Sequence, residues 1–288
     1  MNTEKRQSMA VSGDFTDASN KGKDLGRFET EPPYAYLWDR CVYELLYDPQ
    51  RYTEQLCDLF AQYGVDKNSA VLDTCAGSGF PAMDMYNMGY ENVTCVDASD
   101  DQIELFRQKA EAQSLDIRST KSFWNELPEH FSPGQFKALI CKGSIWYAAG
   151  GWNKDFKPNR EETLDALRKT LAVFYSMLED GGVLYVDKFK DSEVDHKDIV
   201  GTFEVAGDKK DLIFYTHRER EEGVRRAKMI IKDENTGEET GTPNVTYDLK
   251  EEELEQILQE VGFSVIRPNL SEEKIFTQWL AIKGKAKE

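Results

Sequence analysis

The sequence predicts an α/β fold built on a mostly parallel sheet, and two neighbouring stretches carry most of this prediction. Residues 70–74 are short, apolar and bounded by polar residues, as expected of a buried strand. Gly77 and Gly79 follow this strand, and a helical stretch begins at Ala82. A strand, a glycine turn and a helix N-terminus together form a corner at which backbone N–H groups face a nucleotide.

A second strand ends in an acidic residue at the spacing typical of a nucleotide site. Residues 93–97 are apolar and end in Asp97, which lies 20 residues after Gly77. A carboxylate at this place accepts both hydroxyls of a ribose. Asp73 ends the first strand, where it would repel a pyrophosphate but suits a cationic ligand. This disfavours a dinucleotide site, although Gly77-x-Gly79-x-x-Ala82 also fits that fingerprint loosely.

Helices and strands alternate on both sides of this corner. Two helices are expected before the first strand, and the first of them is rich in aromatic residues; they cover residues 34–47 and 49–63. After Asp97 the pattern predicts a helix, two strands, a helix and a fifth strand, at residues 100–113, 117–120, 136–141, 160–178 and 183–189.

The pattern changes after the fifth strand. Three strands separated by glycine turns are expected at residues 202–206, 212–218 and 224–232. They indicate an antiparallel β insertion at about residues 198–245, which can cover the active site or form a contact in a homo-oligomer. A helix at residues 250–261 and strands at residues 263–267 and 276–283 then complete the sheet. Residues 1–30 are polar and are expected to form a flexible tail or a lid, so that residues 31–288 make up a single domain.

Composition narrows the possible partners. Thirty-six basic and 53 acidic residues give a net charge of −17, which disfavours nucleic acid and anionic membranes. The five cysteines form no CxxC pair, and neither a secretory signal nor a membrane-spanning run is visible, so a cytoplasmic protein is expected. The three histidines have no metal-ligand spacing, and we expect no metal site. A small-molecule substrate remains as the expected partner.

The corner resembles that of class I S-adenosylmethionine-dependent methyltransferases. The resemblance rests on Leu-Asp-x-x-x-Gly-x-Gly at residues 72–79 and Val-Asp-Ala-Ser at residues 96–99. Over residues 34–283 the chain also resembles the glycine N-methyltransferase and glycine/sarcosine methyltransferase group. This resemblance implies a Rossmann-like, seven-stranded sheet with helices on both faces, S-adenosylmethionine as cofactor and S-adenosylhomocysteine as product.

The same resemblance assigns the residues that bind the cofactor. Arg51, 22 residues before Asp73, corresponds to the arginine that pairs with the methionine carboxylate of the cofactor. Trp124 corresponds to the tryptophan beside the adenine, and Phe123 stands where the family has asparagine. The complete expected set is Arg51, Asp73, Ala76, Gly77, Gly79, Asp97, Ala98, Phe123, Trp124, Cys141, Lys142 and Gly143.

The acceptor site departs from the family. The arginine that binds the substrate carboxylate after the fifth strand is replaced by Lys188-Phe189-Lys190. A lysine binds a carboxylate as a point charge without a planar fork, so glycine itself does not follow from the resemblance. The expected catalytic residues are Tyr34, Tyr43 and Tyr147, and the expected substrate-binding residues are Trp146, Lys188, Lys190 and Tyr247.

The expected reaction is methyl transfer to a small amine or amino acid by in-line displacement. Tyrosine hydroxyls and backbone carbonyls can orient an amine lone pair without a strong base, whereas a phenol needs a base or metal for ionisation. Two alternatives stay open: an O-methyltransferase acting on a small carboxylic acid or phenol, and a cofactor-binding regulator without catalytic activity.

Overall fold

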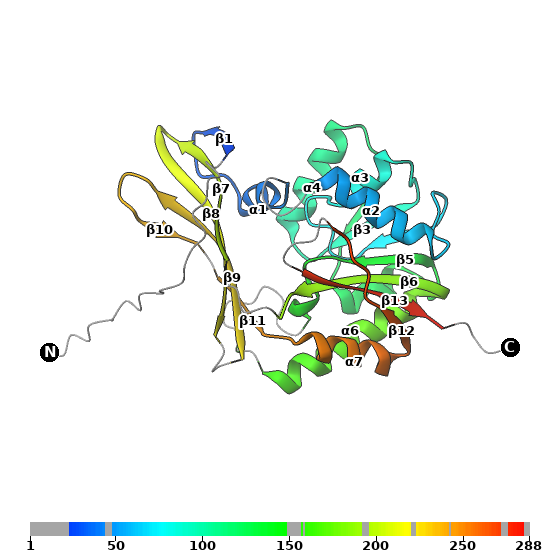
Figure 1. Ribbon diagram of the computed structural model, residues 1–288. Coiled ribbons are helices and arrows are strands. Elements are labelled where there is room, and N and C mark those ends of the chain that lie inside the picture. Colours follow the sequence, from blue (N-terminus) through cyan, green and yellow to red (C-terminus); the bar gives the residue numbers. More distant parts are fainter. Residues whose placement is uncertain are drawn as a thin grey trace.

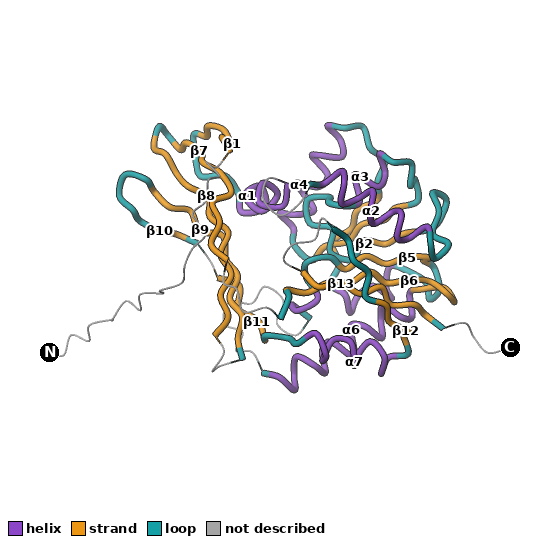
Figure 2. Tube along the Cα trace, viewed as in Figure 1, coloured by secondary structure: helices purple, strands orange, loops and turns teal. Residues whose placement is uncertain are grey.

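The computed structural model describes residues 23–43, 48–148, 157, 159–191, 196–219, 223–241, 243–271 and 276–284 of the 288-residue chain. These residues form two separate sheets, and helix α1 (Tyr34–Cys41) lies between them (Figure 1, Figure 2). The larger sheet belongs to an α/β layer structure, and the smaller sheet stands beside it.

The larger sheet has seven strands in the order β12-β13-β6-β5-β2-β3-β4. Neighbouring strands pair in parallel, except that β13 runs antiparallel to both β6 and β12. This confirms the predicted mostly parallel, seven-stranded sheet. The strands are β2 (Val71–Asp73), β3 (Val93–Asp97), β4 (Arg118–Lys121), β5 (Phe136–Cys141), β6 (Leu178–Phe189), β12 (Phe263–Ile266) and β13 (Phe276–Lys283).

Helices cover both faces of this sheet because successive strand residues point to opposite sides. Val71 packs into a cluster with the buried residues of α2, α3 and α4, whereas its neighbour Leu72 packs into a cluster with those of α6 and α7. The remaining helical segments are α2 (Pro49–Ala61), α3 (Ala82–Asn87), α4 (Asp100–Ala112), η2 (Trp124–Glu126), α5 (Leu127–His130), η3 (Ile145–Tyr147), α6 (Arg160–Met177) and α7 (Glu251–Val261).

Side chains cap the N-termini of the longer helices near the corner. Asp48 accepts a hydrogen bond from the backbone N–H of Arg51 at the start of α2. Ser99 does the same for Gln102 at the start of α4, directly after Asp97. Each cap satisfies a backbone N–H group that has no partner inside the helix, so these helices begin at defined residues.

The second sheet is formed mainly by the predicted insertion. Its strands are β1 (Lys23–Phe28), β7 (His196–Val205), β8 (Asp208–Glu219), β9 (Val224–Asp233), β10 (Glu239–Thr240) and β11 (Pro243–Tyr247). They follow the order β1-β7-β8-β9-β10, and β11 also pairs with β9. The β7–β8 hairpin turns at Ala206 and Gly207, both with positive φ, as a tight hairpin requires.

Two details differ from the sequence-based expectation. Residues 23–28, expected within a tail or lid, form β1 and pair in parallel with β7. The fifth core strand begins at Leu178 rather than at residue 183, because Leu178 already pairs with Phe136 of β5 before an irregularity in the register. Residues 1–22 and 44–47 lie outside the described part of the chain. No helix within the described ranges is long and apolar enough to cross a membrane.

Candidate functional site

The glycine turn after β2 forms the floor of the site. Gly77 has a φ of 51°, and its backbone N–H donates to Asp97 Oδ2 at 2.9 Å. Gly79 has a φ of 121°, and a Cβ at this residue would lie 2.6 Å from the sulfur of Met83. Both positions therefore require glycine, and the turn brings the end of β2 and the end of β3 together.

Asp97 is fixed as an acceptor at the end of β3. Its Oδ2 accepts the Gly77 N–H, and its Oδ1 accepts the backbone N–H of Ser99 at 2.9 Å. Burial raises the pKa of Asp97, while the N–H groups of Ser99, Gly77 and Ala98 act in the opposite direction. Each carboxylate oxygen keeps a second lone pair that a ligand hydroxyl can use.

Two polar atoms beneath the turn have no hydrogen-bond partner among the described residues. One is Oδ2 of Asp73, whose Oδ1 accepts the N–H of Cys75 at 3.2 Å. Burial raises the pKa of Asp73 to about 8. The other is Oε1 of Gln102, which would lie 3.7 Å from a Cβ placed on Gly77. Unsatisfied buried acceptors are costly, so their presence at one corner indicates a place for donors of a ligand.

A cleft of about 440 Å³ extends from this corner along α6. Its walls include Asp97, Ala98, Phe123, Trp124 and Tyr147. Phe123 is 51% exposed, which is unusual for a phenylalanine and leaves its ring available in the cleft.

Trp124 in the same cleft has a more fixed position. Its Nε1–H donates to the carbonyl oxygen of Thr74 at 2.7 Å, and its ring packs edge-on against Phe174. Trp124 therefore ties the η2 segment to the end of β2, while Phe123 presents the more accessible ring to the cleft.

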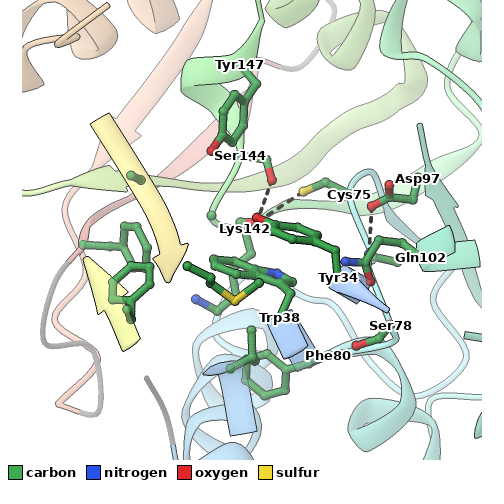
Figure 3. A pocket seen from close by; sticks show the side chains of 18 of the residues that line it. Tyr34, Trp38, Cys75, Ser78, Phe80, Asp97, Gln102, Lys142, Ser144 and Tyr147 are labelled. Atoms are coloured by element: carbon green, nitrogen blue, oxygen red, sulfur yellow. Dashed lines mark hydrogen bonds between the residues drawn. The ribbon is translucent and has the colours of Figure 1, made fainter. Parts of the chain in front are cut away.

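A smaller aromatic cavity of about 90 Å³ joins the cleft (Figure 3). We call it the aromatic cavity because seven rings line it: Tyr34, Trp38, Phe80, Tyr147, Phe189, Phe214 and Phe276. Cys75, Asp97, Ser144 and Tyr147 line both spaces, which are therefore continuous. Since a water needs about 10–15 Å³ by this measure, the aromatic cavity has room for a small molecule.

The second sheet supplies one wall of the aromatic cavity. Phe214 of β8 and Ala227 and Met229 of β9 line it together with α1 residues. Trp38 of α1 lies 6.2 Å from Phe214, ring centre to ring centre. The insertion therefore forms part of the wall of the site.

Asp39 holds α1 over the turn. This carboxylate is 4% exposed, and its Oδ1 accepts from Ser78 Oγ at 2.5 Å and from Lys109 Nζ at 2.6 Å. Ser78 belongs to the glycine turn and Lys109 to α4, so a single buried carboxylate connects three elements around the aromatic cavity.

The end of β5 lies opposite the turn. Cys75 donates from Sγ to the carbonyl oxygen of Lys142 at 3.3 Å, and Cys75 Sγ lies 4.0 Å from Cys141 Sγ. Gly143 and Lys142 line the aromatic cavity, whereas Cys141 is fully buried behind it. Among the residues that the structure describes, no group of three or more His, Cys, Asp or Glu side chains has an arrangement suited to a metal ion.

The structure brings most of the expected cofactor residues together. Ala76, Gly77, Asp97, Ala98, Phe123, Trp124, Lys142 and Gly143 line one or both spaces, and Asp73, Gly79 and Cys141 lie directly beside them. Arg51 is different, because it is exposed on α2 and lines neither space.

The expected acceptor residues are divided. Tyr34 and Tyr147 line the aromatic cavity. Tyr43 does not line it: its ring packs against Phe80 and lies under Lys109 Nζ, and burial raises the pKa of its hydroxyl. The side chain of Trp146 lies outside the described part of the structure.

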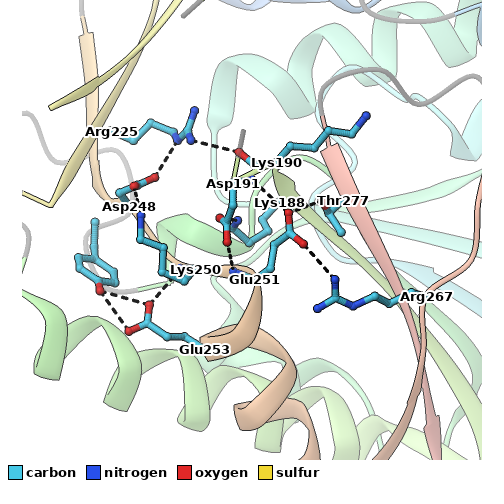
Figure 4. A network of polar contacts seen from close by, with 11 residues as sticks. Lys188, Lys190, Asp191, Arg225, Asp248, Lys250, Glu251, Glu253, Arg267 and Thr277 are labelled. Carbon is cyan, nitrogen blue, oxygen red and sulfur yellow. Dashed lines mark hydrogen bonds and ion pairs between the residues drawn. The ribbon is translucent and has the colours of Figure 1, made fainter. Parts of the chain in front are cut away.

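Lys188 and Lys190 belong to a polar network between β6, the second sheet and α7 rather than to the cavity wall (Figure 4). Tyr247 joins this network through Glu253 and does not line the cavity either. Lys188 Nζ pairs with Asp191 at 2.7 Å, and the side chain of Lys188 is 4% exposed. The hydroxyl of Tyr247 donates to Glu253 at 3.2 Å. Asp191 and Glu251 each accept the other's backbone N–H at 3.0 Å, and this exchange holds the start of α7 against the end of β6.

Several cavity residues were absent from the sequence-based set, notably Trp38, Ser78, Gln102, Phe214 and Met229. Gln102 had a local signal, since it lies in the first turn of the helix that follows Asp97. Phe214 and Met229 had none, because their position depends on how the second sheet packs against α1.

Comparison with known proteins identifies the central part of the chain. Residues 71–182 match the family of methyltransferase domains. The chain is 28% identical over 118 residues to a glycine/sarcosine N-methyltransferase of Aphanothece halophytica, covering 41% of this chain and 39% of that protein. It is also 28% identical over 168 residues to a putative methyltransferase of Geobacillus sp. (strain WCH70), covering 58% and 60%. The chain thus matches less than two thirds of the length of either relative.

Solved structures share the fold over most of the chain. An S-adenosylmethionine-dependent methyltransferase from Clostridium acetobutylicum has a TM-score of 0.64 at 15% identity, covering 87% of this chain and 98% of that one. A sugar N-methyltransferase from Streptoalloteichus sp. has a TM-score of 0.64 at 15% identity, with coverages of 97% and 100%. An amino pentose methyltransferase from Micromonospora echinaspora, solved with its cofactor bound, has a TM-score of 0.63 at 13% identity, with coverages of 88% and 99%. At these identities the likeness concerns the fold.

Proposed function

We propose that this chain transfers a methyl group from S-adenosylmethionine to the nitrogen of a small-molecule amine. It has the fold of class I methyltransferases, and residues 71–182 match a methyltransferase domain. The observation that supports the acceptor class is the aromatic cavity, which is lined by seven rings, borders the glycine turn and joins the nucleotide cleft.

The residues present fit S-adenosylmethionine. Asp97 and the turn around Gly77 suit the ribose, as in nucleotide-binding α/β folds. The unpartnered acceptors of Asp73 and Gln102 suit the positively charged and N–H-bearing part of the cofactor. The exposed ring of Phe123 suits the adenine face, because aromatic rings stack on bases. When bound, S-adenosylmethionine supplies a methyl group that is already activated on a sulfonium.

The protein then has to align an amine with that methyl group and keep water out. Orientation of two reactants can contribute about 7 to 11 kcal/mol to lowering a barrier. The rings of Trp38, Phe80 and Phe214 give the aromatic cavity apolar walls, which offer water few hydrogen-bond partners. Aromatic faces also attract cations by about 0.5 to 2 kcal/mol each, which favours the charged sulfonium and the ammonium product.

Tyr34 and Tyr147 carry the tyrosine hydroxyl groups on the wall of the aromatic cavity, and these can orient the acceptor. A tyrosine oxygen accepts an N–H of a neutral amine and so directs the nitrogen lone pair. In the transfer, the lone pair forms the N–C bond while the C–S bond breaks, and the methylated ammonium afterwards loses a proton to water. This step needs no strong base, in agreement with a wall in which Asp97 is the only carboxylate among the described lining residues.

The related proteins guide the choice of acceptors. One is a glycine/sarcosine N-methyltransferase and two of the similar structures act on amino sugars, according to their names. We therefore propose a panel of glycine, sarcosine, other small amino acids, amino sugars and simple amines. Small acids, phenols and catechols complete the panel.

Transfer of radiolabelled methyl from S-adenosylmethionine tests the proposal. The expected result is a base-stable methylamine product together with S-adenosylhomocysteine, and loss of both in Asp97→Asn. A base-labile methyl ester or a methyl phenol would show that oxygen is the acceptor. Absence of transfer to every amine in the panel would contradict the N-methyltransferase proposal.

A further inference from the structure

One basic side chain stands on the wall of the aromatic cavity. Lys142 directly follows β5, and its side chain is only 6% exposed. Its Nζ lies 3.4 Å from Oδ2 of Asp187, whose side chain is fully buried. The Tyr52, Phe276 and Phe80 rings surround the ammonium, with centroids 4.5, 5.3 and 5.9 Å from Nζ. Figure 3 shows Lys142 among the residues of this wall.

Asp187 is held in place by more than Lys142. Its Oδ1 accepts the backbone N–H of Gly143 at 2.5 Å, and its Oδ2 accepts the hydroxyl of Tyr185 at 3.3 Å. The hydroxyl of Tyr185 in turn lies 2.6 Å from that of Tyr52. The carboxylate is thus a fixed counter-ion at the end of β6, and it positions the ammonium rather than the reverse.

The ammonium of Lys142 can bind more than one acceptor at a time. An ammonium has three donor hydrogens, so it can donate to Asp187 and to a second anion at the same time. Aromatic faces attract the cation but accept no strong hydrogen bond from it. A buried ion pair also contributes little to stability compared with apolar side chains of similar size, so its position at the cavity wall favours a role in binding.

The other cations expected to bind an anionic group are elsewhere. Arg51 is exposed on α2, and Lys188 is paired with Asp191 in the polar network of Figure 4. Among the described residues that line the aromatic cavity, Lys142 is the only lysine, arginine or histidine. A carboxylate that enters this cavity therefore meets one positive side chain.

We propose that Lys142 is the carboxylate anchor of the aromatic cavity: its ammonium, positioned by Asp187, binds a carboxylate that accompanies the methyl transfer. This inference rests on the proposed function. The carboxylate has two possible sources, the methionine end of the cofactor and an amino-acid acceptor. Both place the same chemical group beside the same ammonium, and the experiment separates them.

The wild-type protein provides the first measurement. Calorimetric titration compares S-adenosylmethionine with decarboxylated S-adenosylmethionine, and methyl transfer compares pairs of amines with and without a carboxylate, such as glycine and methylamine. Anchoring of the cofactor predicts at least tenfold weaker binding of the decarboxylated form. Anchoring of the acceptor predicts at least tenfold lower kcat/KM for the amine without a carboxylate. Equal behaviour within both pairs would overturn the inference.

Variants then assign the preference to Lys142. Lys142→Met is expected to remove the preference for ligands with a carboxylate. The double variant Lys142→Met/Asp187→Asn does not leave a buried carboxylate without its counter-ion, so its folding is less affected. Lys137→Met is the matched control, because Lys137 lies on the same strand but pairs with Glu179 away from both spaces. A carboxylate preference that survives in both Lys142 variants would overturn the inference.

The outcomes also separate this inference from the proposed function. If the wild-type protein binds neither form of S-adenosylmethionine, the proposed function fails. If it binds both forms equally and methylates both kinds of amine equally, the function stands and the role of Lys142 fails.

Discussion

Replacement of Asp73 by asparagine is predicted to stabilise the ligand-free protein and to weaken cofactor binding. Asp73 is 1% exposed, its Oδ2 has no partner among the described residues, and burial raises its pKa from 3.8 to about 8. A carboxyl with a raised folded pKa contributes stability that is complete below its unfolded pKa and is lost as pH rises through its folded pKa. The protein therefore loses stability from this group between about pH 4 and pH 8.

The size of the effect follows from the pKa shift. One pKa unit corresponds to about 1.4 kcal/mol, so the shift of about four units sets an upper limit of about 6 kcal/mol. Between about pH 5.5 and about pH 8.5 the expected loss in the wild-type protein is on the order of 3 kcal/mol. The amide introduced by Asp73→Asn cannot ionise and keeps an oxygen for the N–H of Cys75, so this loss is expected to disappear in the variant.

Urea unfolding of the ligand-free protein at these two pH values measures the difference. Asp116→Asn is the control, because Asp116 is an exposed carboxylate in the loop before β4. The expected result is a gain in the free energy of unfolding for Asp73→Asn that grows with pH, together with weaker binding of S-adenosylmethionine by calorimetry. A variant that is no more stable than the wild type at the higher pH would refute the reasoning.

Three further substitutions test the site. Asp97→Asn replaces an acceptor oxygen with an amide N–H that faces another N–H donor. The affinity for S-adenosylmethionine is therefore expected to fall at least about tenfold by calorimetry. An unchanged affinity would contradict the role of Asp97. Asp39→Asn loses the ion pair with Lys109, and we expect the free energy of unfolding to fall by about 1 to 3 kcal/mol and amide exchange in α1 to accelerate; unchanged exchange in α1 would show that Asp39 does not hold this helix. Phe123→Ala removes a stacking surface worth about 1 to 3 kcal/mol and is expected to weaken cofactor binding about tenfold. Trp124→Phe loses the hydrogen bond to Thr74 and is expected mainly to lower the melting temperature. The reverse pattern would assign the adenine to Trp124.

The nucleotide corner could be predicted because its signals are local. The strand ending at Asp73, the glycines and the strand ending at Asp97 each leave a mark within a few residues, and parallel pairing then brings their ends together. The same holds for the helices, because apolar residues that recur every three or four positions indicate them.

The acceptor side could be predicted only in part because its geometry depends on long-range packing. β1 pairs with β7 residues that lie 177 or 178 positions later, and no local pattern in residues 23–28 indicates that partner. The alternation of side chains along β6 does not predict that the ammonium of Lys188 pairs with Asp191. Phe214 becomes a cavity residue only through the position of the second sheet against α1.

The same limit explains the different positions of Arg51 and Lys142. Spacing along the sequence placed Arg51 near the methionine end of the cofactor, but spacing does not determine which side of α2 a residue occupies. The structure has Arg51 exposed and Tyr52 fully buried beneath the ammonium of Lys142. The buried side of α2 thus contacts Lys142, the cation on the wall of the aromatic cavity.

The most direct test of the central claim is a calorimetric titration of the protein with S-adenosylmethionine, S-adenosylhomocysteine and NAD. The account predicts that the first two bind at one site per chain, that Asp97→Asn weakens both, and that NAD does not bind. Binding of NAD without binding of S-adenosylmethionine would contradict the assignment of the corner formed by Asp73, Gly77 and Asp97.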